Sequence, residues 1–301
     1  MHFVELFRKH TFVFILGLIA PLTVFTVFAG YPILYNFFLS FTRWNGLSPN
    51  IQPVGLHNYI ELSRDPRFIL SLVNTLKWTI LSLLISLGLG LLLSIVLFLG
   101  KVYLPSLFRL LIFVPVTMSL VATGIMFSLI LSPEFGLLDQ SLRLLHLTGL
   151  SHFWLGDYRT ALYVLIAIGA WGYAGIPLML FHAGLSEIDA ELLDAARLDG
   201  ASDFQLARHI ILPTLRPVFV IVALLSVIQS LRTFDLVATM TQGGPAGSTK
   251  VLGYFMYSET FWNNRFGYGA AISVIMLVLS SGFAWTYLRS VANNALHVSK
   301  Q

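Results

Sequence analysis

Four hydrogen-bonding side chains recur at helical spacing inside an otherwise apolar run. Ser226, Gln229, Ser230 and Thr233 lie at i, i+3, i+4 and i+7, so a helix places them on one face. Such a stripe could line a path for a polar solute. It could equally join two membrane helices, because Ser and Thr commonly form hydrogen bonds between them. The sequence leaves both interpretations open.

Patterns that would indicate catalysis or metal binding are missing from the apolar runs. The string closest to a phosphate-binding loop, Gly244 to Lys250, has the wrong residue order and follows an apolar helix. No His-Glu-x-x-His, Gly-x-Ser-x-Gly or carboxylate cluster occurs within a run. The chain has no cysteine, which excludes disulfides and thiolate metal sites. We therefore predict no catalytic residue, no metal ligand and no cofactor in this chain.

The elements that must position the stripe are the spans of a polytopic membrane protein. Of the 301 residues, 56% are hydrophobic and 11% are charged, with a mean hydropathy of +0.80, far from an average soluble domain. Six runs are long enough to cross about 30 Å of hydrocarbon, namely residues 11–41, 70–99, 107–131, 160–181, 218–240 and 269–287. The first is longer than a signal-peptide core, so we expect a retained transmembrane helix.

Charged side chains avoid the centres of these runs. His182, Asp235 and Lys77 lie near run ends, where an interfacial residue is favoured over a proton relay. An ion-coupled carrier is therefore disfavoured.

Lys and Arg divide equally between the two sides of the membrane, so charge alone does not give the orientation of the chain. Nucleic-acid binding is not expected, since no basic patch with interleaved aromatic residues occurs. Small residues are expected to allow close helix approach at Gly88, Gly90, Gly124, Gly169 and Gly172.

The segment from Leu185 to Pro217 is the one long charged stretch between two runs. Ser186 followed by Asp189 predicts a helix that begins near Glu187. Its end is expected at Asp199-Gly200, because glycine suits the left-handed position after a helix.

A second short helix follows in the same segment. Ser202 and Gln205 form a capping pattern, and Pro213 and Pro217 are expected to end or kink the helix. On the first helix an apolar face is predicted for Ile188, Leu192 and Ala195. The segment thus has the features of a docking element for another protein.

The same segment resembles the EAA motif of permease subunits of binding-protein-dependent ABC importers. The matching positions are Asp194-Ala195-Ala196, Gly200 and Ile210-Ile211-Leu212-Pro213. Other segments are similar to the carbohydrate branch of that family, related to the maltose and glycerol-3-phosphate permeases. They are Tyr31-Pro32-Ile33-Leu34, Ser40 to Asn45, Gly55 to Tyr59, Asn74-Thr75, Phe234-Asp235, Thr241 to Pro245 and Phe266 to Ala271.

The resemblance implies an all-α polytopic membrane protein with six transmembrane helices and a MetI-like type I importer permease fold. Residues 1–69 would hold the first transmembrane helix and an outer loop, 70–288 the permease core with a cytoplasmic coupling-helix loop at 185–217, and 289–301 a cytoplasmic tail. The expected place is the bacterial or archaeal cytoplasmic membrane, with both termini cytoplasmic.

The implied partners are a second, related permease, a pair of ABC ATPase subunits that bind ATP and Mg²⁺, an extracytoplasmic solute-binding protein and membrane lipid. The resemblance assigns ATPase coupling to Leu192, Asp194, Ala195, Ala196, Asp199, Gly200, Ala201 and Leu206. It also favours a sugar-contacting role for the stripe, and Trp171 and Tyr173 could stack on a sugar ring, although Trp171 could equally be ordinary packing. The expected substrate pathway is therefore Trp171, Tyr173, Ser226, Gln229, Ser230 and Thr233.

Two positions depart from the family pattern. Asp194 replaces a glutamate and is one methylene shorter, and Ala207 stands where relatives often have an aromatic residue. Either the partner ATPase is adapted, or docking relies more on Leu192 and Leu206. Two other functions stay open. One is a permease of an importer for amino acids or phosphate compounds, and the other is a membrane channel without ATP coupling.

Overall fold

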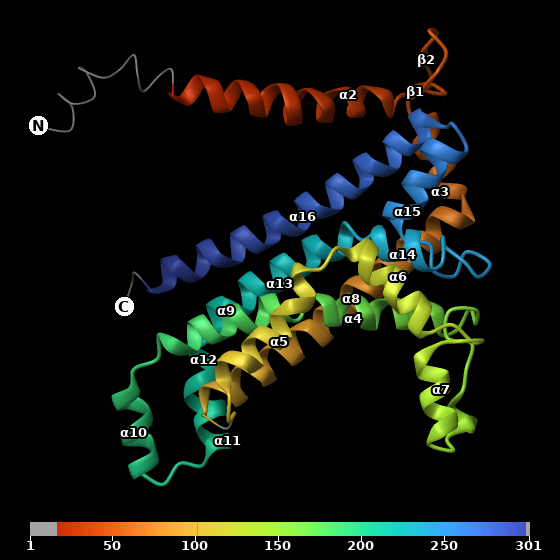
Figure 1. Cartoon of the computed structure of the whole chain (residues 1–301). Coiled ribbons are helices and arrows are strands. Elements are labelled where there is room, and N and C mark those ends of the chain that lie inside the picture. Colours follow the sequence, from red (N-terminus) through yellow and green to blue (C-terminus); the bar gives the residue numbers. More distant parts are fainter. Residues whose placement is uncertain (1–16, 101, 299–301) are drawn as a thin grey trace, which may run out of the picture. The chain divides into compact units, whose positions relative to one another are not determined.

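The computed structural model describes residues 17–100 and 102–298, which are mostly helical (Figure 1). Of the 18 Lys and Arg residues weighed for the orientation, Arg8, Lys9, Lys101 and Lys300 lie outside the described residues. The chain forms two compact units, Met1–Arg64 with Met256–Leu277, and Asp65–Phe255 with Val278–Gln301. These units reflect packing and leave the predicted division at residues 69 and 288 untested.

The first unit joins a long apolar helix to a small hairpin. The helix Gly17–Leu39 contains a π-helical turn at Thr26–Gly30 and ends as α2, Tyr31–Leu39. Antiparallel strands β1, Thr42–Arg43, and β2, Gln52–Pro53, follow, with α3 at His57–Arg64. The buried Asn58 amide donates to the Ser40 and Thr42 carbonyls at 2.9 Å each. It thereby fixes the hairpin to α3.

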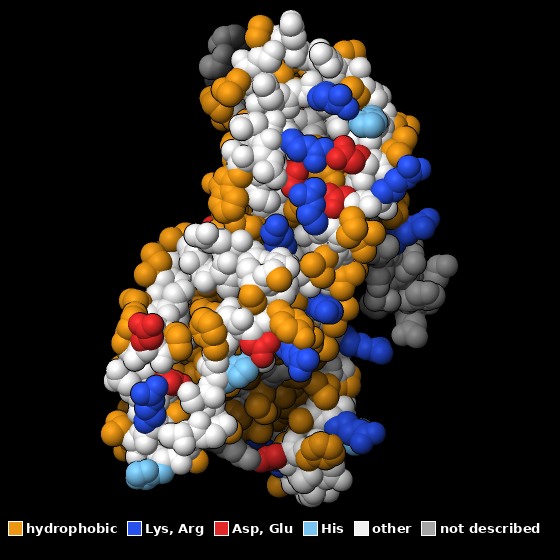
Figure 2. Space-filling view, turned by 90° about the vertical axis from the view of Figure 1, so that its right-hand side faces the viewer, with side chains coloured by type: hydrophobic (Ala, Val, Ile, Leu, Met, Phe, Trp, Pro, Cys, Tyr) orange, Lys and Arg blue, Asp and Glu red, His pale blue; other side chains and the backbone are white. Residues whose placement is uncertain are grey.

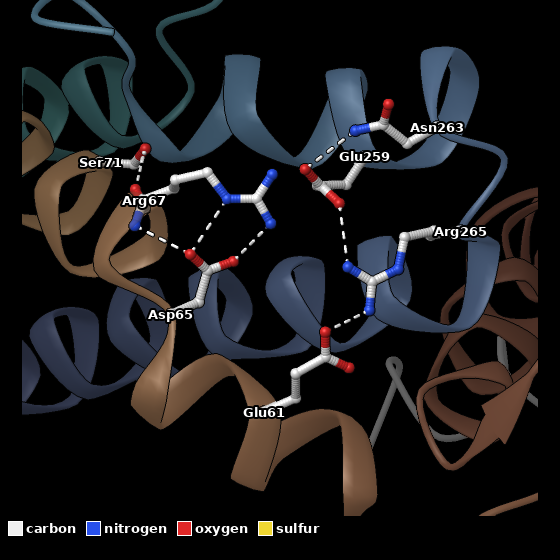
Figure 3. Close-up of polar contacts among 7 residues, drawn as sticks. All are labelled: Glu61, Asp65, Arg67, Ser71, Glu259, Asn263 and Arg265. Carbon is white, nitrogen blue, oxygen red and sulfur yellow. Dashed lines mark hydrogen bonds and ion pairs between the residues drawn. The ribbon is translucent and has the colours of Figure 1, made fainter.

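The first unit also contains a buried carboxylate, Glu259, on the π-helical turn Ser258–Trp262. Arg265 donates to it at 3.3 Å and pairs with Glu61 (Figure 3). The Arg265 guanidinium also lies over the Tyr268 ring, 3.9 Å from the ring centroid. Asn263 donates to the other Glu259 oxygen at 3.0 Å. These contacts compensate a charge that would otherwise be costly to bury.

We expect Arg265→Met to destabilise the protein by about 3 kcal/mol, because it removes the guanidinium from a carboxylate that is 2% exposed. Thermal unfolding in detergent measures the loss. Glu61→Gln is the matched control, since Glu61 pairs with the same guanidinium but is more exposed, and it should cost under about 1 kcal/mol. Equal losses in the two variants would contradict the assignment of Glu259 as the residue that needs Arg265.

The second unit is built around one helix, α4, Pro66–Phe98. It starts at Asp65, which caps the backbone N–H of Arg67 at 2.9 Å and pairs with its guanidinium at 2.8 Å (Figure 3). Along α4 pack α8, Ala161–Tyr173, α9, Gly175–Ser186, and α13, Arg216–Leu231 (Figure 1). Its buried face is mainly small or polar, as expected for helices that approach closely in a membrane, with Ser71, Asn74, Thr75, Trp78, Ser82, Ser86, Gly90 and Ser94.

The remaining elements of the second unit are shorter. They are α5, Pro105–Thr117; α6, Leu120–Ile130; α7, Leu137–Leu144; a 3₁₀ turn, Thr148–Leu150; α10, Ala190–Leu198; α11, Asp203–Leu206; a π-helical turn, Ala207–Ile211; α12, Leu212–Thr214; and α14, Asp235–Met240. Two helices belong to both units, α15, Leu252–Tyr257, and α16, Phe266–Val298. Within the second unit, α10 and α7 stand clear of the helices along α4, at opposite ends of them (Figure 1). On the face of the molecule that Figure 2 shows, most of the surface is hydrophobic or uncharged. Acidic and basic side chains gather together in one area of that face.

Three described helices are long and apolar enough to cross a membrane, Gly17–Leu39, Pro66–Phe98 and Phe266–Trp285. Three bent pairs bring the count to six if each pair is one span, which agrees with the six predicted runs. The pairs are α5 with α6, bent by 100°, α8 with α9, bent by 42°, and the helix Asp203–Thr214 with α13, bent by 68°.

The bends between α5 and α6 and between α8 and α9 were not predicted. The predicted fifth run, 218–240, is wrong in extent. Pro115 lies just before the break after Thr117, where Met118 and Ser119 are extended, consistent with the helix-breaking effect of proline. In the fifth run, α13 ends at Leu231 and a new helix, α14, begins at Asp235.

Three of the five glycines predicted to allow close helix contact do so. A Cβ on Gly90 would collide with Pro177 of α9, one on Gly124 with Thr239 of α14, and one on Gly169 would lie 3.0 Å from the Trp78 ring. The prediction is wrong for Gly88 and Gly172, because no neighbouring atom lies within 4 Å of a Cβ there.

Gly90→Ala is expected to lower stability by about 1–3 kcal/mol, because the added methyl overpacks the contact between α4 and α9. Gly88→Ala, two residues away on the same helix, should be neutral or slightly stabilising, since alanine has the higher helix propensity. Unfolding temperatures of the two variants in one detergent give the comparison. A similar loss in both would mean that helix contact is not what requires Gly90.

Candidate functional site

The segment between α9 and α13 forms two short helices joined by a turn, as predicted, but the first begins later. Ser186 is not the cap, because α9 extends to it and its hydroxyl donates to the His182 carbonyl at 2.9 Å. Asp189 is the cap instead, accepting from the Glu191 N–H at 2.9 Å. The helix α10 therefore starts at Ala190 and not near Glu187.

The end of α10 is a complete Schellman motif. Gly200 has a φ of +84°. Its N–H donates to the Arg197 carbonyl, and that of Ala201 to the Ala196 carbonyl, both at 3.0 Å. These two bonds satisfy carbonyls that the helix end leaves free. The predicted stop at Asp199-Gly200 is confirmed.

The predicted second start and the kink are confirmed too. Ser202 and Gln205 form a reciprocal capping box. The chain then bends by 68° between the helix Asp203–Thr214 and α13. Pro213 and Pro217 lie on either side of this bend, in the first turns of α12 and α13.

The two faces of this segment differ. Leu193 and Leu206 are buried in a cluster with Phe181, Leu185 and Leu215, so Leu206, at 1% exposure, holds the segment from inside and does not face a partner. Outward-facing apolar residues are Leu192, at 51% exposure, Leu198, at 90%, and Phe204, at 71%.

Sequence reasoning missed Leu198 and Phe204. Leu198 follows Ala195 by three residues, so the predicted apolar stripe of Leu192 and Ala195 extends to it. Ile188 does not belong to the outward face, because it precedes α10 and is buried. Asp194 is exposed and pairs with Arg197 at 3.5 Å. We call the exposed residues Leu192, Asp194, Ala195, Leu198 and Phe204 the loop face.

A cavity of about 280 Å³ lies in the second unit between α4, α5, α8, α9 and α13. It is lined by polar and aromatic side chains together with small residues. They include Trp78, Ser82, Ser86, Gly172, Tyr173, Ser226, Gln229, Ser230, Arg232, Thr233 and Asp235. Five of the six predicted pathway residues therefore border one cavity.

The residues of the predicted polar stripe do not all have the same role: one joins two helices, and others face the cavity where a solute could lie. The Ser230 hydroxyl is buried, bonds the Ser82 hydroxyl of α4 at 2.8 Å, and donates to the Ser226 carbonyl at 2.7 Å. Ser230 therefore joins two helices. Gln229 and Thr233 remain accessible on the cavity side, so they are the members best placed to contact a solute.

The aromatic wall of the cavity differs from the predicted one. Tyr173 borders the cavity, but Trp171 does not, and instead packs edge-on against Phe127 with ring centroids 5.4 Å apart. Trp78 of α4 takes its place. The sequence did contain a pattern that indicates this face of α4, because Trp78, Ser82 and Ser86 recur every four residues and therefore lie on one side of the helix.

The cavity borders a break between helices. Arg232, Thr233 and Phe234 separate α13 from α14. The Thr233 N–H bonds the Ser230 carbonyl at 3.2 Å, and the Phe234 ring stacks on Tyr254 at 6.2 Å. A Cβ on Gly253 would lie 2.7 Å from the Thr233 carbonyl oxygen. Irregular backbone at membrane depth is tolerated where it lines a cavity, so this break is a structured part of the site.

Among residues 17–100 and 102–298, no group of three or more His, Cys, Asp or Glu side chains could hold a metal ion.

Comparison with known proteins gives consistent matches. Residues 86–290 match the family described as binding-protein-dependent transport system inner membrane component. A probable ABC transporter permease from Pyrococcus horikoshii is 36% identical over 274 residues, covering 91% of this chain and 94% of the relative. The arabinooligosaccharides transport system permease AraP of Bacillus subtilis is 34% identical over 260 residues, covering 85% and 80%.

The fold is also similar to a solved structure. A bacterial ABC transporter involved in the import of the acidic polysaccharide alginate superposes with a TM-score of 0.79 at 20% identity, covering 96% of this chain and 99% of that one. A second structure of a bacterial alginate ABC transporter, in complex with an alginate pentasaccharide-bound periplasmic protein, also gives 0.79, at 18% identity and 94% coverage of both chains.

Proposed function

The chain belongs to the family of binding-protein-dependent transport system inner membrane components, and on this premise we propose that it is the permease subunit of an ATP-driven importer of a carbohydrate. Members of this family are multi-pass subunits of the inner membrane that carry out transport and not catalysis. The carbohydrate class is supported by the names of relatives, which include permeases of arabinooligosaccharide, multiple-sugar, lactose and trehalose/maltose transport systems. Hydrogen-bonding and aromatic side chains around the cavity fit such a solute.

The observation that carries the proposal is the direct connection between the loop face and the cavity. From Asp203 the chain runs through α11 and α12 into α13, and the last turn of α13, which contains Gln229, borders the cavity. The bend between them is packed, since Ile211 and Leu215 are fully buried and Phe181 contacts the Phe219 ring at 4.8 Å. A displacement of the loop would therefore move α13 as a body and change the cavity.

The loop face is the proposed docking site for an ABC ATPase, which would hold the ATP and Mg²⁺. Leu192, Leu198 and Phe204 expose apolar area that a partner could bury, and removal of apolar surface from water favours association. Asp194, Ala195 and Ala196 lie on α10, and Asp199, Gly200 and Ala201 form its terminal turn. Leu206 would support that turn from inside.

Further parts of the proposal concern the assembly and its movement. A second, related permease would complete the pathway, and an extracytoplasmic binding protein would deliver the solute. Docking of a cytoplasmic ATPase would put the loop face on the cytoplasmic side. Six spans would then put both termini on that side as well. Alternating access would follow from movement of the spans when two ATPase subunits close.

Purification of the tagged chain with its associated proteins tests the proposal. A second permease and an ATPase should co-purify, and the reconstituted complex should hydrolyse ATP faster when a sugar-loaded binding protein is added. Stimulation by an amino acid or a phosphate compound instead would favour another importer branch. Solute flux without any ATPase would favour a channel.

A further inference from the structure

Two oppositely charged residues, Arg232 and Asp235, border the cavity beside the break between α13 and α14. Arg232 is exposed, whereas Asp235 is partly buried. Across the described residues, neither side chain forms an ion pair or a side-chain hydrogen bond with the protein. The remaining polar lining groups, such as Gln229 and Thr233, are neutral.

An ionised carboxylate can only accept hydrogen bonds. The Asp235 carboxylate is partly exposed to the cavity, so water supplies its donors when the cavity holds no solute, and a solute that displaces this water must supply a donor in its place. A solute hydroxyl would supply that donor to Asp235, and Arg232, Gln229 and Thr233 could donate to solute oxygens. The site thus fits a molecule with many hydroxyl groups.

The two charges do not cancel in their effect on a charged solute. Solvent screens the exposed Arg232 guanidinium, while the Asp235 carboxylate is more shielded from water and acts more strongly at short range. A solute that carries a carboxylate would be repelled by Asp235 and would also leave that group without a donor.

We propose that Asp235 is a charge filter that makes the cavity select uncharged, polyhydroxylated solutes over uronic acids, with Arg232 limiting the strength of the filter. The inference rests on the proposed carbohydrate function and adds the charge class of the solute. The fold does not decide this point, because a transporter of the same fold is involved in the import of the acidic polysaccharide alginate.

The test measures solute binding to the purified importer complex by saturation-transfer NMR, without binding protein, so that only the permease selects. The probes are α-1,4-linked galactotriose and trigalacturonate, which differ only in oxidation at C6. We expect the neutral trisaccharide to bind the unmodified complex about tenfold more tightly, a ratio within reach of one short-range charge interaction. Asp235→Asn should reduce this ratio severalfold by strengthening trigalacturonate binding, and Arg232→Gln should increase it.

Glu134→Gln is the matched control, because it removes an exposed carboxylate outside the cavity and should leave the ratio unchanged. Equal binding of the two probes to the unmodified complex, or the same ratio in Asp235→Asn and Arg232→Gln, would overturn the charge filter while leaving carbohydrate import intact. Absence of binding by both probes would overturn the filter as well, whereas the proposed carbohydrate function fails only if no sugar-loaded binding protein stimulates ATP hydrolysis.

Discussion

Gly200→Pro is expected to abolish solute-stimulated ATP hydrolysis by the assembled importer, reducing it at least tenfold to the basal rate, while the membrane helices stay folded. Gly200 has a φ of +84°, which proline cannot adopt because its ring holds φ near −65°. Proline would also remove the N–H that bonds the Arg197 carbonyl. The turn between α10 and α11 would then be rebuilt, and the loop face would lose its orientation.

A graded pair of variants separates coupling from simple backbone strain. Gly200→Ala imposes a left-handed alanine that costs about 1 kcal/mol, and should lower stimulated hydrolysis partly. Gly55→Ala creates similar strain in the first unit, where φ is +58° and no atom lies within 4 Å of the new Cβ, and it should leave stimulation unchanged. Hydrolysis assays with and without loaded binding protein, together with co-purification of the ATPase, provide the readout. Full stimulation in Gly200→Pro would count against the docking assignment.

Gln229→Trp should reduce solute uptake by at least tenfold without preventing assembly with the ATPase. Gln229 borders a cavity of about 280 Å³, and an indole ring would occupy space that the solute needs. The side chain is accessible and makes no buried side-chain contact in the described structure that the change would break, so the fold should tolerate it. Thr233→Trp should act in the same way. Uptake into proteoliposomes and co-purification measure the two effects separately.

Two controls follow from the division of the stripe. Ser230→Ala removes the hydrogen bond to Ser82 and should cost about 1 kcal/mol of stability while uptake continues. Trp171→Ala should also keep most uptake, because that ring packs on Phe127 outside the cavity. Normal uptake in Gln229→Trp and Thr233→Trp would remove these residues from the pathway.

The sequence by itself determined the features that depend on neighbours within a few residues. The turn at Gly200 and the capping box of Ser202 with Gln205 are local, because each bond joins groups within five residues. Local reasoning failed at Ser186, which was predicted to cap the helix with Asp189 as its acidic partner, because α9 extends to Ser186 and Asp189 is the cap instead. The six apolar runs were likewise predictable, since crossing the membrane requires only length and hydropathy.

Tertiary structure alone decided which side chains face the cavity. Ser230 and Gln229 are adjacent in sequence, but Ser230 is buried because it meets Ser82, 148 residues away. Trp78 and not Trp171 forms the aromatic wall for the same reason, since the choice depends on how α4 packs against α8 and α13. A stripe of polar residues specifies a face, whereas the helices packed against that face determine which residues contact protein and which contact solute.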